Sequence, residues 1–306
     1  MMRGPVLLLF LDGVGLASED EHNPFAHARL PVLRSLLGGA PPLAEHAGLQ
    51  TSHASLHALD AVLGMAGLPQ SGTGQAALFT GVDAIALHGR HFGPWVPTAL
   101  RPMLAEQNLL VRSQAEGRDV AFANAYPEEA VAMLRDGARR LPSFLRAGPP
   151  IAAHAAGLLT LHTRELAQGA AVASEITNTG WREKLQRDVP DITPAQAGHN
   201  LAGIVRAHDL TMFAHYQTDT VGHTRELGPA IAALEKVDAF IGGLLDALPE
   251  NAIVVIASDH GNIEDVRMQH TRNPALGMVI GPVAGRAELG AITDVAPFIQ
   301  RVLRGT

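Results

Sequence analysis

Residues 253–262 read IVVIASDHGN, a short apolar run with a polar cluster directly behind it. A continuous apolar stretch of this length is typical of a parallel strand buried on both faces of a sheet. In an open α/β sheet, the residues just beyond the carboxyl ends of the strands line the ligand-binding crevice. Asp259 and His260 are therefore predicted to lie in a binding site at the edge of such a sheet.

Two further segments repeat this arrangement. Residues 6–11 (VLLLFL) run directly into an aspartate, and residues 210–214 (LTMFA) precede the sequence DTVGH. Aspartate oxygens and histidine nitrogens are donors that bind divalent transition metals. A single Asp–His pair is usually a solvated loop feature, whereas six such donors close to strand ends predict a two-metal enzyme. The candidate ligands are Asp12, Asp219, His223, Asp259, His260 and His270.

The remaining pattern indicates the fold class. Helices are predicted at residues 31–37, 194–208 and 229–248, and a further strand at residues 278–280. Strands that alternate with helices are typical of an α/β fold with a doubly wound, mostly parallel sheet.

The middle of the chain differs from both ends. Proline-rich breaks near residues 93–102 and 188–194 enclose a block with its own helix and strand patterns and with none of the candidate ligands. We interpret residues 1–96 and 190–306 as a metal-binding core, and residues 97–189 as an inserted smaller α/β cap domain between two hinges. The alternative is a series of long excursions from a single sheet.

Composition limits the possible partners. The chain has 306 residues, a formal charge of -7 and no cysteine. The negative charge argues against a nucleic-acid partner, which requires a basic surface. The absence of cysteine excludes disulfides and thiolate metal sites. No apolar stretch is long enough for a membrane span, and residues 6–11 are too short for a signal-peptide core, so we expect a cytoplasmic protein without a membrane partner.

A glycine-rich turn precedes another short helix. Ser71-Gly72-Thr73-Gly74 at a helix start presents free backbone N–H groups, which suit a phosphate. A hydroxyl here could act as a nucleophile if a nearby metal lowered its pKa. The turn is not a Walker motif, because no lysine follows the glycines. On its own, the pattern also fits an ordinary helix cap.

Together these motifs resemble those of a known family. Asp12 in LDG, the DTVGHT segment that starts at Asp219, the segment 257–262 (ASDHGN) and the segment 270–274 (HTRNP) are similar to elements of the alkaline phosphatase superfamily. Within that superfamily they resemble the cofactor-independent phosphoglycerate mutases and the phosphopentomutases. The resemblance covers the predicted core and implies the alkaline phosphatase-like fold.

The resemblance also implies a ligand set. One metal would be held by Asp12, Asp259, His260 and the nucleophile, and the other by Asp219, His223 and His270. The family's S-x-x-G turn places Ser71 as nucleophile and metal ligand, with Thr73 as the alternative. Two divalent ions are expected, with Mn²⁺ ahead of Zn²⁺ because the most similar families are mutases.

The implied activity is phosphotransfer on a small phosphorylated metabolite through a phosphoserine, as a phosphomutase or a phosphatase. The alternative is a non-catalytic metal-binding or ligand-sensing member of the same fold. All six candidate ligands and a hydroxyl are present, which favours the enzyme.

Two departures leave the substrate open. Gln75 stands where the phosphoglycerate mutases have a histidine, and the element HxDGRD of their transferase domain is absent. Arg90 and His91, at the first predicted hinge, are the candidate substrate-binding residues, and Arg182 and Lys184 in the predicted cap are weaker candidates.

Overall fold

The structure is a computed structural model that describes residues 4–138 and 140–306. Its centre is a six-stranded sheet with the order β2-β6-β5-β1-β4-β3. The strands are β1 (Val6–Leu11), β2 (Ala54–Leu59), β3 (Val120–Phe122), β4 (Leu210–His215), β5 (Ile253–Ala257) and β6 (Ala275–Ile280). Strands β3, β4, β1 and β5 are mutually parallel, whereas β6 runs antiparallel to both β5 and β2. The predicted α/β fold with a mostly parallel sheet is confirmed.

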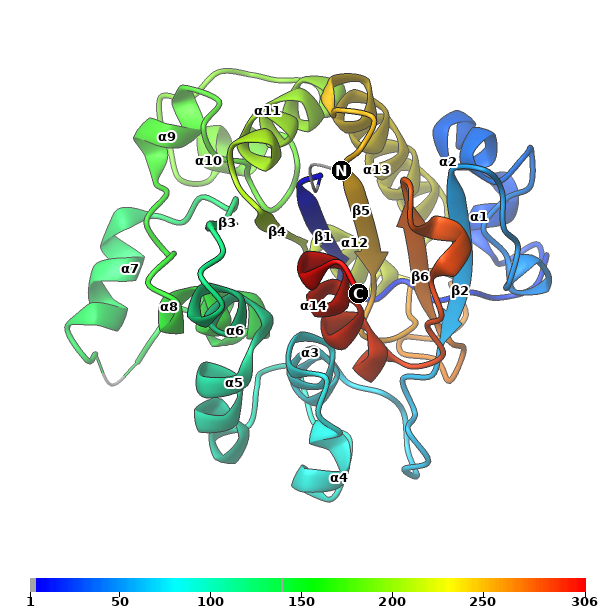
Figure 1. Cartoon of the computed structure of the whole chain (residues 1–306), viewed down its shortest axis with the longest axis horizontal. Helices are drawn as coiled ribbons and strands as arrows, with labels where there is room; N and C mark the ends of the chain where they lie inside the picture. Colours follow the sequence, from blue (N-terminus) through cyan, green and yellow to red (C-terminus); the bar gives the residue numbers. More distant parts are fainter. Residues whose placement is uncertain (1–3, 139) are drawn as a thin grey trace.

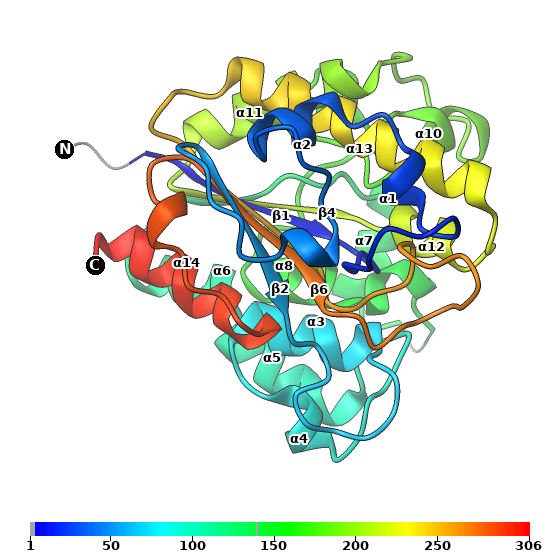
Figure 2. The same ribbon diagram turned by 90° about the vertical axis from the view of Figure 1, so that its right-hand side faces the viewer.

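Helices cover both faces of this sheet (Figures 1 and 2). In Figure 2, α2, α11 and α13 lie above the sheet, and α3, α5 and α14 lie below it. The longer helices are α3 (Ser71–Thr80), α7 (Glu128–Arg135), α8 (Gly148–Ala155), α11 (Pro194–Ala207), α13 (Leu227–Ala247) and α14 (Val295–Arg304). The shorter ones are α1 (Pro24–His27), α2 (Pro31–Leu36), α4 (Ala84–His88), α5 (Arg101–Gln107), α6 (Leu109–Ala115), α9 (Thr163–Ala167), α10 (Thr179–Glu183) and α12 (Gln217–Gly222). No helix within the described ranges is both long and apolar enough to cross a membrane.

Strand β1 shows why the core has two halves. Successive side chains of a strand point to opposite faces, so Leu7 and Leu9 pack with α11 and α13, while Leu8 and Phe10 pack with α3 and α14. The ring of Phe10 lies edge-on to Phe79 of α3, with 5.2 Å between ring centroids. All of these side chains are fully buried. This packing holds α3 against the end of β1.

The predicted helices agree with the structure to within one or two residues. Helix α11 begins after Thr193, whose hydroxyl accepts a hydrogen bond from the backbone N–H of Gln196 in a capping box. Helix α3 begins at Ser71 and ends before Gly81, which has the left-handed conformation that glycine adopts without steric cost.

The block of residues 97–189 differs from the separate cap that its proline-rich borders suggest. Strand β3, from this block, pairs in parallel with β4 in the main sheet, with Val120 opposite Leu210. Apolar side chains of α5, α6 and α8 belong to the same core as β1 and α3. A smaller apolar cluster around Trp181 and Leu166 lies outside that core. The alternative interpretation, excursions from a single sheet, therefore fits the first part of the block, because its apolar side chains are buried in the core of the main sheet.

Candidate metal centre

The candidate ligands come together at the carboxyl edge of the sheet. Asp12 follows β1, Asp219 and His223 lie on and just after α12 behind β4, Asp259 and His260 follow β5, and His270 precedes β6. They form two groups whose potential ligand atoms lie within 4.8 Å of one another. One group is Asp12, Asp259 and His260, and the other is Asp219, His223 and His270. The rings of His260 and His270 stack with centroids 4.1 Å apart, so the two groups adjoin.

The first group is fully enclosed by protein. His260 Nε2 lies 3.5 Å from Asp12 Oδ1 and 3.7 Å from Asp259 Oδ2. Both carboxylate oxygens are buried and have no hydrogen-bond partner among the described residues. A buried polar atom without a partner is costly, and buried charges are generally paired or bound to metal. The donor set and the two unpartnered oxygens therefore fit a divalent cation.

Electrostatics supports the same conclusion. Burial raises the pKa of Asp12 well above its ordinary value, and the nearby carboxylates of Asp259 and Asp219 raise this pKa further. Burial also raises the pKa of Asp259. The cluster thus disfavours its own ionisation, because like charges are held together away from water. A bound cation reverses this effect, since it favours the ionised carboxylates.

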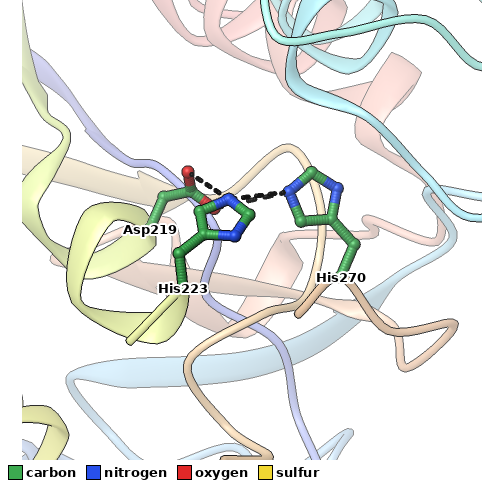
Figure 3. A group of neighbouring side chains, drawn as sticks. All are labelled: Asp219, His223 and His270. Atoms are coloured by element: carbon green, nitrogen blue, oxygen red, sulfur yellow. Dashed lines mark hydrogen bonds and ion pairs between the residues drawn. The ribbon is translucent and has the colours of Figure 1, made fainter. Parts of the chain in front are cut away.

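The second group, drawn in Figure 3, is more exposed than the first, because His223 is exposed and Asp219 is partly buried. Asp219 and His223 are one helical turn apart, and His223 Nε2 lies 3.3 Å from both Asp219 Oδ2 and His270 Nε2. The Nδ1 of His270 lies 2.8 Å from the carbonyl of Pro69. A donated Nδ1–H at that distance leaves Nε2 with a free lone pair for a metal.

The charges of this group also suit a cation. Burial alone would raise the pKa of Asp219, but hydrogen bonds from His223 and Asn262 and the proximity of His260 outweigh it and lower the pKa to about 2. Burial, helped by His260, lowers the pKa of His270 to about 4. An ionised carboxylate beside a neutral imidazole is the form in which these residues bind metals.

The two candidate hydroxyls have different surroundings. Ser71 Oγ lies 2.9 Å from His260 Nε2, at the first residue of α3. Thr73 Oγ1 instead accepts a hydrogen bond of 3.1 Å from the backbone N–H of Phe92. Gly72 lies between them, and a Cβ there would collide with the carbonyl of Trp95. The turn thus brings Ser71 to the first ligand group, whereas the hydroxyl of Thr73 is used in a hydrogen bond with Phe92.

Two polar residues support the ligands and were not predicted. The amide of Asn262 donates hydrogen bonds to Oδ1 and to the backbone carbonyl of Asp219, at 2.7 and 3.1 Å. The buried carboxylate of Glu264 accepts from the backbone N–H groups of Gly15 and Asn262 and from the side chain of Thr271. Asn262 belongs to the DHGN segment and could have been found from it, whereas nothing in the sequence around Glu264 indicates this role.

Gln75, the departure from the mutase pattern, also contacts the site. Its Nε2 donates to Asp12 Oδ2 at 3.2 Å, and its Oε1 accepts from the backbone N–H of Gly148 at 2.8 Å. The side chain is buried, and its two hydrogen bonds link the first ligand group to the start of α8. A neutral amide in this place holds one oxygen of Asp12 and leaves the other oxygen free.

A cavity of about 410 Å³ opens beside the second group. Its polar lining consists of Gln70, His223, Arg225, Arg267, Gln269 and His270. Arg90 and His91 do not line this cavity. The guanidinium of Arg90 lies 5.6 Å over the ring of Phe92, and His91 is partly buried, which lowers its pKa.

The weaker substrate-binding candidates, Arg182 and Lys184, make no contact with the candidate site among the described residues. The guanidinium of Arg182 pairs with Asp191 at 3.1 Å, and Lys184 is exposed after α10.

Comparison with protein families gives one model that covers nearly the whole chain. The model described as the Metalloenzyme superfamily matches residues 4–299.

Curated relatives match a smaller part of the chain. It is 30% identical over 121 residues to the 2,3-bisphosphoglycerate-independent phosphoglycerate mutase of Cereibacter sphaeroides, a match that covers 36% of this chain and 24% of that protein. The mutase of the same name from Paracoccus denitrificans is 35% identical over 122 residues, with the same coverage of both chains. The match thus spans about a quarter of the length of these relatives.

Solved structures share the fold over the whole chain. The PH0037 protein from Pyrococcus horikoshii superposes with a TM-score of 0.60 at 13% identity, covering 100% of this chain and 98% of that one. A cold-active alkaline phosphatase from Shewanella sp. gives a TM-score of 0.51 at 10% identity, covering 96% and 99%. The alkaline phosphatase-like fold implied by the sequence motifs is confirmed.

Proposed function

The chain belongs to the Metalloenzyme superfamily, and from this we propose that it is a two-metal phosphotransfer enzyme that acts through a phosphoserine at Ser71. The observation that carries the proposal is the position of Ser71 Oγ, 2.9 Å from His260 Nε2. That nitrogen lies 3.5 and 3.7 Å from two buried carboxylate oxygens that have no hydrogen-bond partner within the described residues. The proposed nucleophile, a helix start suited to bind phosphate and two candidate metal-ligand groups would thereby act at one place.

The proposed ligands follow the two groups. Asp12, Asp259, His260 and Ser71 would hold one ion, and Asp219, His223 and His270 would hold the other. Two divalent ions held there would supply positive charge that lowers the pKa of the Ser71 hydroxyl and stabilises the transferring phosphoryl group. We favour Mn²⁺ over Zn²⁺ because the matched curated relatives are mutases, although oxygen and imidazole donors accept both ions.

Groups of the chain itself would bind the phosphoryl group and carry out its transfer to and from Ser71. Ser71 Oγ gives up its proton and forms a bond to phosphorus while the bond between phosphorus and the ester oxygen of the substrate breaks. The leaving oxygen takes up a proton, so the step neither gains nor loses a proton overall. Backbone N–H groups at the start of α3 are placed to bind phosphoryl oxygens. In the second step an acceptor oxygen attacks the phosphoserine and restores the Ser71 hydroxyl.

The acceptor decides the net reaction. With water as acceptor the enzyme is a phosphatase, and with another hydroxyl of the same metabolite it is a mutase. The named mutases support a small phosphorylated metabolite as substrate, and the substrate-binding roles of Arg90 and His91 stay predictions.

Turnover and trapping together test the proposal. Wild-type protein reconstituted with Mn²⁺ should release p-nitrophenol from p-nitrophenyl phosphate, and mass spectrometry after rapid quenching should find phosphate on the peptide that contains Ser71. Metal-loaded protein that releases no product from aryl phosphates, phosphoglycerates or sugar phosphates would contradict the proposal. That outcome would favour the non-catalytic metal-binding alternative.

A further inference from the structure

The polar side chains that line the cavity beside the second ligand group are cationic or neutral. Its lining includes the guanidinium-bearing residues Arg225 and Arg267, the imidazoles of His223 and His270 and two glutamines, and no carboxylate residue of the described chain lines it. The protein as a whole carries a formal charge of -7. A cationic cavity on an acidic protein raises the local concentration of anions.

Arg225 is available to a ligand. It lies directly after α12, two residues beyond His223, with its backbone in the left-handed region at a φ of 59°. Its side chain is exposed, and its guanidinium has no hydrogen bond or ion pair with any described residue. A non-glycine residue in this conformation costs about 1 kcal/mol or more, and such strain is concentrated at functional positions.

Arg267 is held in place on the other side of the cavity. Its Nε and one terminal nitrogen each donate to the carboxylate of Asp265 at 2.8 Å, and the other terminal nitrogen lies 3.6 Å from Asp20. The side chain is therefore preorganised, and its donors are already partly used. Arg225 is the arginine whose donors remain free for a bidentate contact with an oxyanion.

We propose that Arg225, assisted by Arg267, binds a second anionic group of the substrate, so that the substrate is a phosphate ester that also carries a carboxylate or a second phosphate. This inference rests on the proposed function, because the transferred phosphoryl group must sit at Ser71 between the two ligand groups. His223 and His270 belong to both a ligand group and the cavity, so an ester bound at Ser71 extends its remaining atoms past these imidazoles toward the arginines.

Binding without turnover tests this site separately from catalysis. Ser71→Ala protein loaded with Mn²⁺ is titrated by calorimetry with glycerol 3-phosphate, 3-phosphoglycerate and glycerol 1,3-bisphosphate. These three ligands share one phosphate and differ in having no second anion, a carboxylate or a phosphate. At least one of the two ligands with a second anionic group should bind about 10- to 100-fold more tightly than glycerol 3-phosphate. The tighter of the two identifies the second anion as carboxylate or phosphate.

Variants assign the preference to the arginine. Adding Arg225→Ala should abolish the preference and leave the affinity for glycerol 3-phosphate unchanged, while Arg225→Lys should keep part of it. Arg164→Ala, which removes an exposed arginine of α9 outside the cavity, is the charge-matched control and should change nothing.

Equal affinities for all three ligands, or a preference that survives Arg225→Ala, would overturn the inference. Absence of turnover in the wild-type protein, with the Arg225-dependent preference intact, would instead contradict the phosphotransfer proposal and support the anion site.

Discussion

The side-chain amide of Asn262 donates a hydrogen bond of 2.7 Å to Oδ1 of Asp219, and this contact joins the loop after β5 to helix α12. The two residues are 43 positions apart in the chain, and each belongs to a segment that carries candidate metal ligands. The orientation of the Asp219 carboxylate therefore depends on the loop that supplies the first ligand group.

Loss of the Asn262 amide should weaken one metal site selectively. Residues that hydrogen-bond to metal ligands typically contribute about 10- to 100-fold in metal affinity. We expect Asn262→Ala to lower the affinity of the Asp219 group for Mn²⁺ by this factor, with a smaller effect on the buried first group. Calorimetric titration of metal-free protein measures both sites. Asn251→Ala, at an exposed asparagine before β5, serves as the control, and equal weakening of both sites would contradict the prediction.

Ser71 and Thr73 should differ sharply when each is replaced by alanine. Ser71→Ala should lower kcat by about 10⁴-fold or more, because the nucleophile is lost. Thr73→Ala removes the acceptor for the Phe92 N–H and should cost about 1 kcal/mol of stability, with a smaller loss of activity. Kinetics and urea unfolding of both variants distinguish these effects. Phosphate found on Thr73 after quenching would show that the assignment of the nucleophile is wrong.

Gly13 should tolerate no side chain. Its φ is 65°, and a Cβ at this position would press on the side chain and backbone of Asp219. Gly64 has a similar φ of 71° with nothing within 4 Å of the added atom, so it isolates the backbone cost. We expect Gly64→Ala to lose about 1–2 kcal/mol of unfolding free energy. Gly13→Ala should lose more and should also weaken metal binding. Similar losses in urea unfolding and unchanged metal affinity would contradict this.

Removal of metal should destabilise the fold. The carboxylates of Asp259 and Asp219 raise the pKa of Asp12, and that of Asp219 also raises the pKa of Asp259, so bound cations would relieve this repulsion. An ion at a free concentration 1,000 times its Kd stabilises the folded state by about 4 kcal/mol. Chelation should therefore lower Tm, and added Mn²⁺ should restore it. Elemental analysis of the restored protein should then find two ions per chain. Protein that contains no metal even after reconstitution with Mn²⁺ or Zn²⁺ would refute the two-metal proposal.

The sequence allowed the candidate site to be predicted better than the parts around it. Asp12, Asp219 and Asp259 could be grouped because parallel strands end at the same edge of a sheet, and their apolar runs are easy to identify. Strand β2 was missed, because Ala54–Leu59 includes Ser55 and His57 and lacks a continuous apolar run. The cavity arginines were missed as well, since only the packing of two loops brings Arg225 and Arg267 to one place.

The middle block shows a second limit. Its proline-rich borders resemble hinges, and its strand β3 spans only Val120–Phe122, which is too short to indicate which sheet it joins. Partner choice among strands depends on contacts across 90 residues of chain, and local sequence does not encode them.

Strand β3 also affects how the protein responds to truncation and how it unfolds. It covers the outer side of β4, the strand that leads into the helix of Asp219. Cutting out the block that contains β3 would leave the outer edge of β4 unpaired, since β1 pairs only with its other edge, and bare strand edges recruit other chains into aggregates. Sheet and core are shared between the block and the rest of the chain, so melting is expected as one cooperative transition. A shortened chain that keeps only the segments of its candidate metal ligands is therefore not a viable engineering scaffold.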